Sequence, residues 1–194
     1  MLARPAALAA ALLLVLAGVT GCRTLNAGSA SPSPSPAHHA APSTTPSSAP
    51  AAAALSGGAC LLLDYQEINS AIGTDFDVAA AATSKGTYLC EVQAGDATYP
   101  QLTLAITATT LTTDDFTSSV KPSGAKSVSS LGKIGYSVPI KATSSAGAGV
   151  EIGWLSGNDR LIVLRYVGAA GSTVPSTLSA GLVTLARKVD ATTV

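Results

Sequence analysis

The chain has 194 residues, of which 47% are hydrophobic, so it is long enough to bury a core of ordinary domain size. Only 11% of the residues are charged, and 11 basic residues balance 11 acidic ones. Nucleic acids and anionic membranes attract dense runs of positive charge, and because this sequence has none, we expect neither as a direct binding target.

The first 21 residues have the pattern of a secretory signal peptide. Arg4 gives a short positive segment, and residues 6–19 form an apolar run of about fourteen residues, shorter than the ~20 residues that span a bilayer. The tetrapeptide Val-Thr-Gly-Cys at 19–22 looks like the lipobox of a bacterial lipoprotein, in which small residues precede a lipidated cysteine. We therefore predict cleavage before Cys22.

Lipidation of Cys22 would attach the mature chain to a membrane. The motif implies a diacylglycerol on the Cys22 sulfur, and two acyl chains hold a protein stably whereas one binds only marginally. The predicted location is therefore the outer face of the cytoplasmic membrane. The alternatives are an ordinary signal peptide with an incidental Cys22, and an uncleaved anchor.

A tether is predicted between the lipid and the folded domain. Residues 23–59 consist mainly of Ser, Pro, Ala, Thr and Gly. Such a segment cannot bury enough apolar surface to offset its ordering entropy, so we expect residues 22–59 to be disordered. At ~3.1 Å per residue the extended segment reaches about 115 Å, which holds the domain away from the lipid surface.

Three cysteines would leave one without a disulfide partner in a secreted chain, unless Cys22 carries lipid. Cys60 and Cys90 then remain, and outside the cytosol such a pair is expected to form a disulfide. A redox or metal-binding role is the alternative. It lacks support, because no Cys-x-x-Cys spacing occurs and residues 60–194 contain no histidine.

Residues 60–194 form one predicted domain. Asp64 stands three residues before a glutamate, as in a capping box, and Gly73 ends the two-turn helix that follows. Residues 87–94 and 101–109 then alternate apolar and polar side chains, which predicts a hairpin of two strands with the cysteine pointing inward.

The second half of the domain begins with a short helix. It is predicted from Thr113, because the acidic residues after it favour the positive end of the helix dipole, and it ends before Pro122. Three further strands follow at 134–140, 150–154 and 162–166.

A closing amphipathic helix is predicted near the C-terminus. Residues 172–173 are its candidate cap, and Arg187 and Lys188 stand in its expected last turn. Its apolar stripe consists of Leu178, Leu182, Leu185 and Val189. The order of elements predicts an α+β fold, in which an antiparallel sheet of five or six strands carries helices on one face.

Four side chains on the predicted strands are candidates for ligand binding: Tyr136, Trp154, Arg165 and Tyr166. The three aromatic residues share their faces with aliphatic neighbours, so core packing is favoured over a ligand pocket. Arg165 is expected on a partly covered face, where its guanidinium needs a partner. We favour a carboxylate from the acidic segment, residues 60–115, and an anionic ligand is the alternative.

No catalytic residue, metal ligand or cofactor is expected. A nucleophile needs a general base within reach, and both histidines, His38 and His39, lie in the predicted tether. The spacing Ser-x-x-Lys occurs at 123–126 and 130–133, but no Lys-Thr-Gly motif follows. The acidic residues at 75–77 and 114–115 lack the spacing of a calcium-binding loop, so turn and cap roles are predicted for them.

Several short motifs along the domain together form one recognisable pattern. They are Cys60-Leu61-Leu62-Leu63, Glu67-Ile68, Ala71-Ile72-Gly73, Cys90 within a strand, and the segment from Leu131-Gly132 to Gly135-Tyr136. With the closing helix, they resemble a family of small actinobacterial lipoprotein domains of unknown function. The plan is also similar to that of the extracytoplasmic sensor domains of mycobacterial serine/threonine kinases. The resemblance implies an envelope-facing, noncatalytic domain.

The sequence therefore predicts a membrane-anchored lipoprotein with a noncatalytic binding or sensory domain. The alternatives are a carrier that holds an acyl chain or other lipid between helices and sheet, and a cell-wall assembly factor that binds protein partners. A deep apolar pocket would favour the carrier, while a solid core with an exposed apolar patch would favour the partner binder. The expected partners are the membrane, through Cys22, and an envelope protein, lipid or cell-wall ligand.

Overall fold

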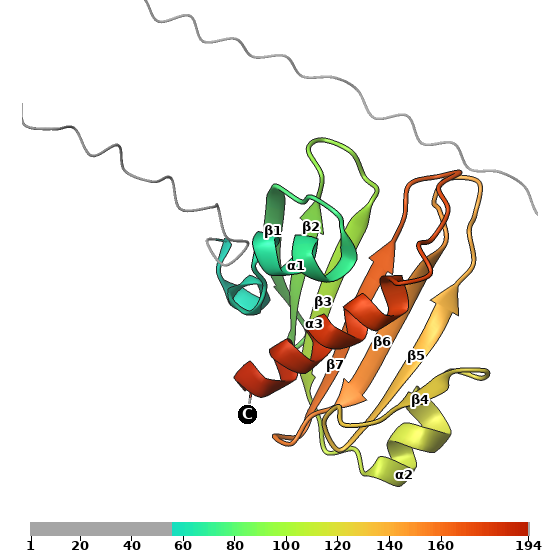
Figure 1. Ribbon diagram of the computed structural model, residues 1–194. Helices are drawn as coiled ribbons and strands as arrows, with labels where there is room; N and C mark the ends of the chain where they lie inside the picture. The colour runs from blue at the N-terminus through green and yellow to red at the C-terminus, as the bar shows by residue number, and fades with distance from the viewer. Residues whose placement is uncertain (1–55, 194) are drawn as a thin grey trace, which may run out of the picture. The chain divides into compact units, whose positions relative to one another are not determined.

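The computed structural model describes residues 56–193 (Figure 1). The predicted signal peptide, Cys22 and the tether as far as residue 55 lie outside the described residues. Contacts with the sheet begin before Cys60, because the Ser56 hydroxyl donates a hydrogen bond to the Ala79 carbonyl oxygen at 2.8 Å.

The elements follow the predicted order, with a 3₁₀ helix and two strands added. In the first half they are the 3₁₀ helix η2 (Gly58–Leu62), α1 (Tyr65–Ile72), β1 (Val78–Ser84), β2 (Thr87–Gln93) and β3 (Gln101–Ala108). In the second half they are α2 (Thr113–Asp115), the π-helical turn η3 (Phe116–Val120), β4 (Lys126–Val128), β5 (Ile134–Ile140), β6 (Gly149–Leu155), β7 (Arg160–Val167) and α3 (Leu178–Thr193).

The strands form one antiparallel sheet in the order β1-β2-β3-β7-β6-β5-β4. The predicted α+β class is confirmed, but the prediction of five or six strands is wrong, since the sheet has seven. The prediction that all helices pack on one face is also wrong, because η3, which continues α2, packs through Phe116 against Tyr136 and Leu155 on the face opposite Trp154. The strands that were missed, β1 and β4, are the two edges. β1 is mostly alanine, which is depleted in strands, and β4 has only 3 residues, so neither shows a clear alternation.

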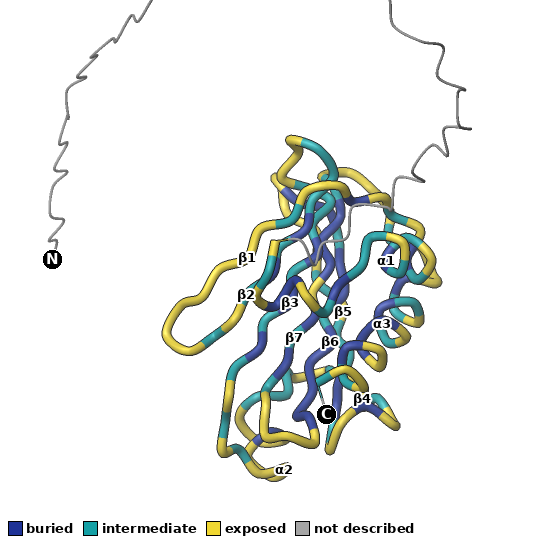
Figure 2. The backbone as a smooth tube through the Cα atoms, turned by 90° about the vertical axis from the view of Figure 1, so that its left-hand side faces the viewer, coloured by how far each residue is buried: buried dark blue, intermediate teal, exposed yellow. Residues whose placement is uncertain are grey.

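Helices α1 and α3 lie side by side on one face of the sheet, here called the helix face (Figures 1 and 2). The predicted apolar stripe of α3 is buried against this face, together with Ile68 of α1 and Leu164 of β7. Gly181 lets the two helices approach closely, because a Cβ there would overlap the Ala71 carbonyl oxygen. No helix within residues 56–193 combines the length and the apolar character needed to cross a membrane.

Helix α3 begins later and ends later than its sequence predicts. It starts at Leu178, and the hydroxyl of Ser172 donates to the Ala169 carbonyl oxygen within the preceding turn instead of capping the helix. The helix continues to Thr193, so Arg187 and Lys188 lie before its last turn. The predicted cap at 172–173 and the predicted dipole interaction are therefore wrong.

Asp64 caps α1 as predicted, since its carboxylate accepts hydrogen bonds from the backbone N–H groups of Gln66 and Glu67 at 2.9 and 3.2 Å. The predicted capping box is incomplete, because the Glu67 side chain accepts no hydrogen bond from the Asp64 backbone. Gly73 ends the helix in a left-handed conformation with φ 68°. The Glu67 carboxylate pairs with Lys188 of α3 at 2.8 Å and so joins the acidic segment, residues 60–115, to the C-terminal helix.

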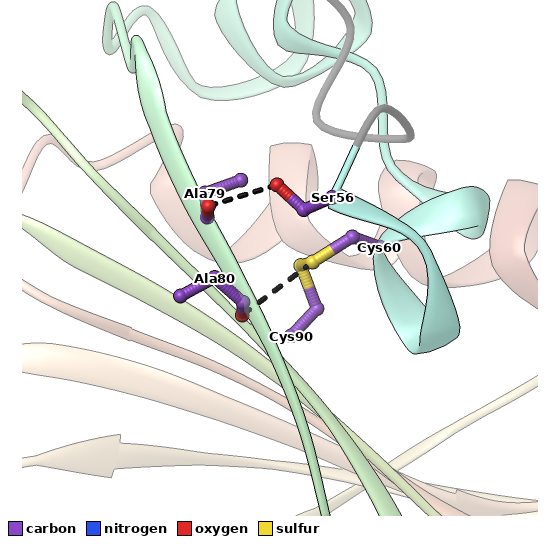
Figure 3. The surroundings of a disulfide bond; sticks show 5 residues. All are labelled: Ser56, Cys60, Ala79, Ala80 and Cys90. Atoms are coloured by element: carbon purple, nitrogen blue, oxygen red, sulfur yellow. Dashed lines mark hydrogen bonds between the residues drawn. A yellow bond between two sulfur atoms is a disulfide. The ribbon is translucent and has the colours of Figure 1, made fainter.

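The predicted disulfide between Cys60 and Cys90 is confirmed (Figure 3). Both cysteines are fully buried, and their Cα atoms lie 4.9 Å apart. Because Cys60 lies in η2 and Cys90 in β2, the bond fixes the start of the folded region to the helix face of the sheet.

Candidate functional site

The face of the sheet opposite α1 and α3, here called the open face, is covered only at one end by described residues. Along β3 the side chains alternate between buried and half-buried, which separates a covered face from an accessible one. At the lower end of the sheet in Figure 1, α2 and η3 cover the open face. Phe116 packs there against Tyr136 and Leu155. The upper part of the open face stays accessible.

A groove of about 530 Å³ lies on this accessible part of the open face. Thr103 and Ala105 of β3 and Val163 of β7 are among its lining residues and lie on neighbouring strands at the centre of the sheet. The loop 141–148 and Tyr99 line its sides, and Figure 1 shows the β2–β3 and β5–β6 loops at the upper end of the sheet. Its volume is in the range that suits small ligands.

Three charged side chains line the groove: Lys141, Glu151 and Arg165. Lys141 and Arg165 are exposed, and Glu151 is half-buried. Within residues 56–193 the ion pairs are Lys133–Asp159 and Lys188–Glu67, so neither cation of the groove is neutralised by a described carboxylate.

Tyr136 holds the Glu151 carboxylate. Its hydroxyl donates a hydrogen bond to Glu151 Oε1 at 2.8 Å. The ring lies across Gly153, its register partner on β6, where any Cβ would overlap the ring and the hydroxyl. Burial raises the pKa of Tyr136 well above its ordinary value, and so do the hydrogen bond to Glu151 and the charge of that carboxylate, so the hydroxyl keeps its proton at neutral pH.

The three aromatic candidates pack in the protein interior, as the alternation along their strands predicts. Trp154 is fully buried on the helix face, and its Nε1–H donates to Asp190 Oδ1 at 2.9 Å. Asp190 also accepts from the backbone N–H of Gly132 at 3.0 Å. Tyr166 belongs to the same core, and Tyr136 is buried beneath η3. None of the three aromatic side chains lines the groove.

Of the four side chains predicted as ligand-binding candidates, Arg165 is the one that lines the groove. The prediction that a carboxylate from residues 60–115 pairs with it is wrong, since no described carboxylate lies within ion-pair distance of its guanidinium. The physical reason is that its face of the sheet is open, so water solvates the guanidinium. Its register partner on β6, Glu151, accepts from Tyr136.

The sequence analysis did not single out Lys141, Glu151 or Asp190. Glu151 belongs to the groove only because the register of β6 with β7 places it beside Arg165. The alternation of β6, which puts Glu151 on the face opposite Trp154, was the available signal. Lys141 lies in the loop after β5, so the alternation of side chains along that strand could not predict its position.

A cap role is confirmed for one of the acidic residues, and a second holds the turn between β2 and β3 from a distant position in the chain. Asp115 forms a capping box with Thr112, and the hydrogen bonds from Thr112 lower the pKa of the Asp115 carboxyl. Asp77 accepts a hydrogen bond from the backbone N–H of Gly95 at 2.5 Å. In the described part of the chain, no three His, Cys, Asp or Glu side chains lie close enough together to hold a metal ion.

A second hollow, of about 370 Å³, lies between η2, β2 and the C-terminal end of α3. Two of its lining side chains are large, apolar and exposed, Leu61 at 65% and Tyr88 at 50%. Exposed apolar side chains that gather at one place can mark a contact with another protein.

The chain matches no protein-family model, no curated protein and no solved structure. The resemblance to small actinobacterial lipoprotein domains therefore stays a prediction. What the site can do follows from its own residues: it offers two cations, a carboxylate, several hydroxyl groups and a small apolar surface on a rigid sheet.

Proposed function

We propose that this chain is a lipoprotein held by Cys22 at the outer face of the cytoplasmic membrane, and that its folded domain is a noncatalytic binding or sensory domain of the cell envelope. The signal-peptide pattern and the lipobox at 19–22 support the anchor. The Cys60–Cys90 disulfide supports an oxidising location outside the cytosol.

The observation that carries the binding role is the groove on the open face. It has a volume of about 530 Å³ and lies on the central strands of a seven-stranded sheet. Small apolar side chains such as Ala105 and Val163 lie there beside charged and hydroxyl-bearing ones, so the groove offers both apolar contact and polar groups that can orient a ligand.

A lipid carrier fits the packing less well. Between the sheet and the helices, buried side chains such as Ile68, Leu164 and Leu182 form a continuous core. An acyl chain in that position would have to displace core side chains, which interiors packed at crystal density resist.

A domain that binds another protein is the second candidate, and the exposed pair Leu61 and Tyr88 favours it. These side chains lie on the far side of the sheet from Arg165, because Tyr88 lies on the same face of β2 as Cys90. The two candidate functions therefore use separate surfaces and can be tested separately.

The test is native mass spectrometry of the full mature chain, extracted in mild detergent from the membranes of its own host. Ala105→Trp fills the groove, and Ala82→Trp places the same side chain on exposed β1, outside the groove. A bound species that the wild type and Ala82→Trp carry and Ala105→Trp loses supports the groove as the ligand site. A species that Ala105→Trp retains, or a wild-type chain that carries nothing, contradicts it.

A further inference from the structure

We propose that the groove recognises an anionic group, a carboxylate or a phosphate, and that Arg165 and Lys141 bind it. This inference rests on the proposed function of the groove as the ligand site, and it names the chemistry of the ligand.

The first support is the charge of the groove. Lys141 and Arg165 contribute two positive charges, and Glu151 is the one acidic residue among its lining side chains. Neither cation has a protein partner among residues 56–193. A guanidinium presents its N–H groups in a planar fork that matches the two oxygens of a carboxylate or phosphate, so Arg165 can hold such a group through paired hydrogen bonds.

The second support is that Glu151 does not neutralise Arg165, although it stands directly opposite on the neighbouring strand. Opposite charges in such cross-strand positions ordinarily attract each other. Here the Tyr136 hydroxyl donates to Glu151 Oε1 at 2.8 Å, and no ion pair joins Glu151 to Arg165. Tyr136 is therefore a positioning residue, which keeps the carboxylate away from the guanidinium.

The third support is that the fold makes room for this hydrogen bond. Gly153 is the register partner of Tyr136, and the aromatic ring occupies the space that a side chain at 153 would need. Phe116 also packs against the ring, with ring centroids 5.7 Å apart. The ring is thus fixed between two elements, with its hydroxyl aimed at Glu151.

The other lining residues of the groove indicate which groups the ligand carries besides its anion. Ala105, Val163 and Val167 give it a small apolar surface, and Thr103, Thr143 and Ser145 add hydroxyl groups. This combination suits a compact ligand that carries an anion, a hydrogen-bonding group and a short apolar part.

The test uses the full mature chain with Cys22→Ser, which keeps it free of lipid, and follows its ¹⁵N NMR spectrum, including the Arg165 Nε–H signal, at constant ionic strength. The probes are N-acetyl-alanine, methyl phosphate and the neutral N-acetyl-alanine amide. We expect saturable shifts at Ala105, Val163 and Arg165 with at least one anion, and at least about tenfold weaker binding of the amide, as loss of a charge-assisted hydrogen bond predicts.

Variants separate anion recognition from a general effect on the fold. Arg165→Gln should weaken anion binding at least tenfold. Arg160→Gln, on the same strand and also exposed but outside the groove, should leave anion binding unchanged. Tyr136→Phe should weaken binding severalfold, because it releases Glu151 to pair with Arg165, and adding Glu151→Gln should restore it.

Several results would overturn the inference. If the amide shifts the groove residues as strongly as the acid, the groove binds ligands but does not select an anion. The same holds if Arg165→Gln binds like the wild type, or if Glu151→Gln does not rescue Tyr136→Phe. If none of the probes shifts Ala105 or Val163, anion recognition is contradicted, while the proposed function is still judged by the species bound to the chain from its own membranes.

Discussion

Gly153 makes room for the Tyr136 ring and so sets the position of the Tyr136 hydroxyl, which donates a hydrogen bond to Glu151 in the groove. The glycine is buried on β6 directly opposite the tyrosine, and the ring fills the place of its missing side chain. The absence of a side chain at Gly153 thus lets the Tyr136 hydroxyl point at Glu151, one of the charged residues of the groove.

Gly153→Ala should lower the free energy of unfolding by about 1–3 kcal/mol, because the added methyl group forces the ring out of its position. Urea denaturation followed by circular dichroism measures this change. Gly157→Ala is the matched control, since a Cβ there meets nothing within 4 Å, and it should change stability by less than ~0.5 kcal/mol. Equal effects of the two substitutions would show that the ring does not depend on Gly153.

Tyr136 also predicts how stability depends on pH. The fold raises the pKa of this tyrosine, so the folded chain holds the proton more tightly than the unfolded chain does. The stabilisation is present below the unfolded pKa of about 10 and is lost as the pH rises above it. Between pH 8 and pH 11, Tyr136→Phe should therefore lose less stability than the wild type in urea denaturation. Equal losses in the two chains would contradict this prediction.

Asp190 ties the end of α3 to the sheet. Its carboxylate accepts from Trp154 Nε1 and from the Gly132 backbone, and Asp190→Ala leaves the buried indole N–H without its partner. We expect a loss of about 1–3 kcal/mol in the free energy of unfolding, together with a changed fluorescence of Trp154. Asp96→Ala, at an exposed turn, is the control. A loss no greater than that of the control would mean that water replaces the carboxylate.

The edge strands show why the elements could be predicted only in part. β2, β3, β5, β6 and β7 each lie with one face on the core, so burial imposed an alternation that the sequence displays. β1 buries neither face fully, and its run of alanine carries no such signal. Its pairing depends on the β2 backbone, which side-chain patterns do not reveal.

The disulfide is the element-level contact whose effect can be measured most simply. It closes a loop with a sequence separation of 30 residues, and its loss should cost about 3–4 kcal/mol in the chain-entropy model. Cys60→Ser combined with Cys90→Ser tests this in urea denaturation. Adding a reductant should destabilise the wild type by a similar amount and leave the double variant unchanged. A double variant as stable as the oxidised chain would mean that η2 is held by its other contacts alone.

At the scale of the whole molecule, we propose that one sheet face serves stability and the other serves binding. The helix face carries α1, α3 and the disulfide, while the accessible part of the open face carries the groove. The strand alternation predicted which side chains face the core, and it placed Arg165 on the other side. It could not predict the groove itself, because Glu151 and Lys141 join Arg165 only through the register of the strands and the path of the β5–β6 loop.

The central claim is that Cys22 holds this binding domain at the membrane, and its most direct test is the location and intact mass of the mature chain. We expect the wild type in the membrane fraction, beginning at an acylated Cys22, and we expect Cys22→Ser in the soluble fraction. The variant Cys60→Ser with Cys90→Ser should stay with the membrane, because its lipid is untouched. A wild-type chain that is released into the medium, or whose first residue is not an acylated cysteine, would contradict the account.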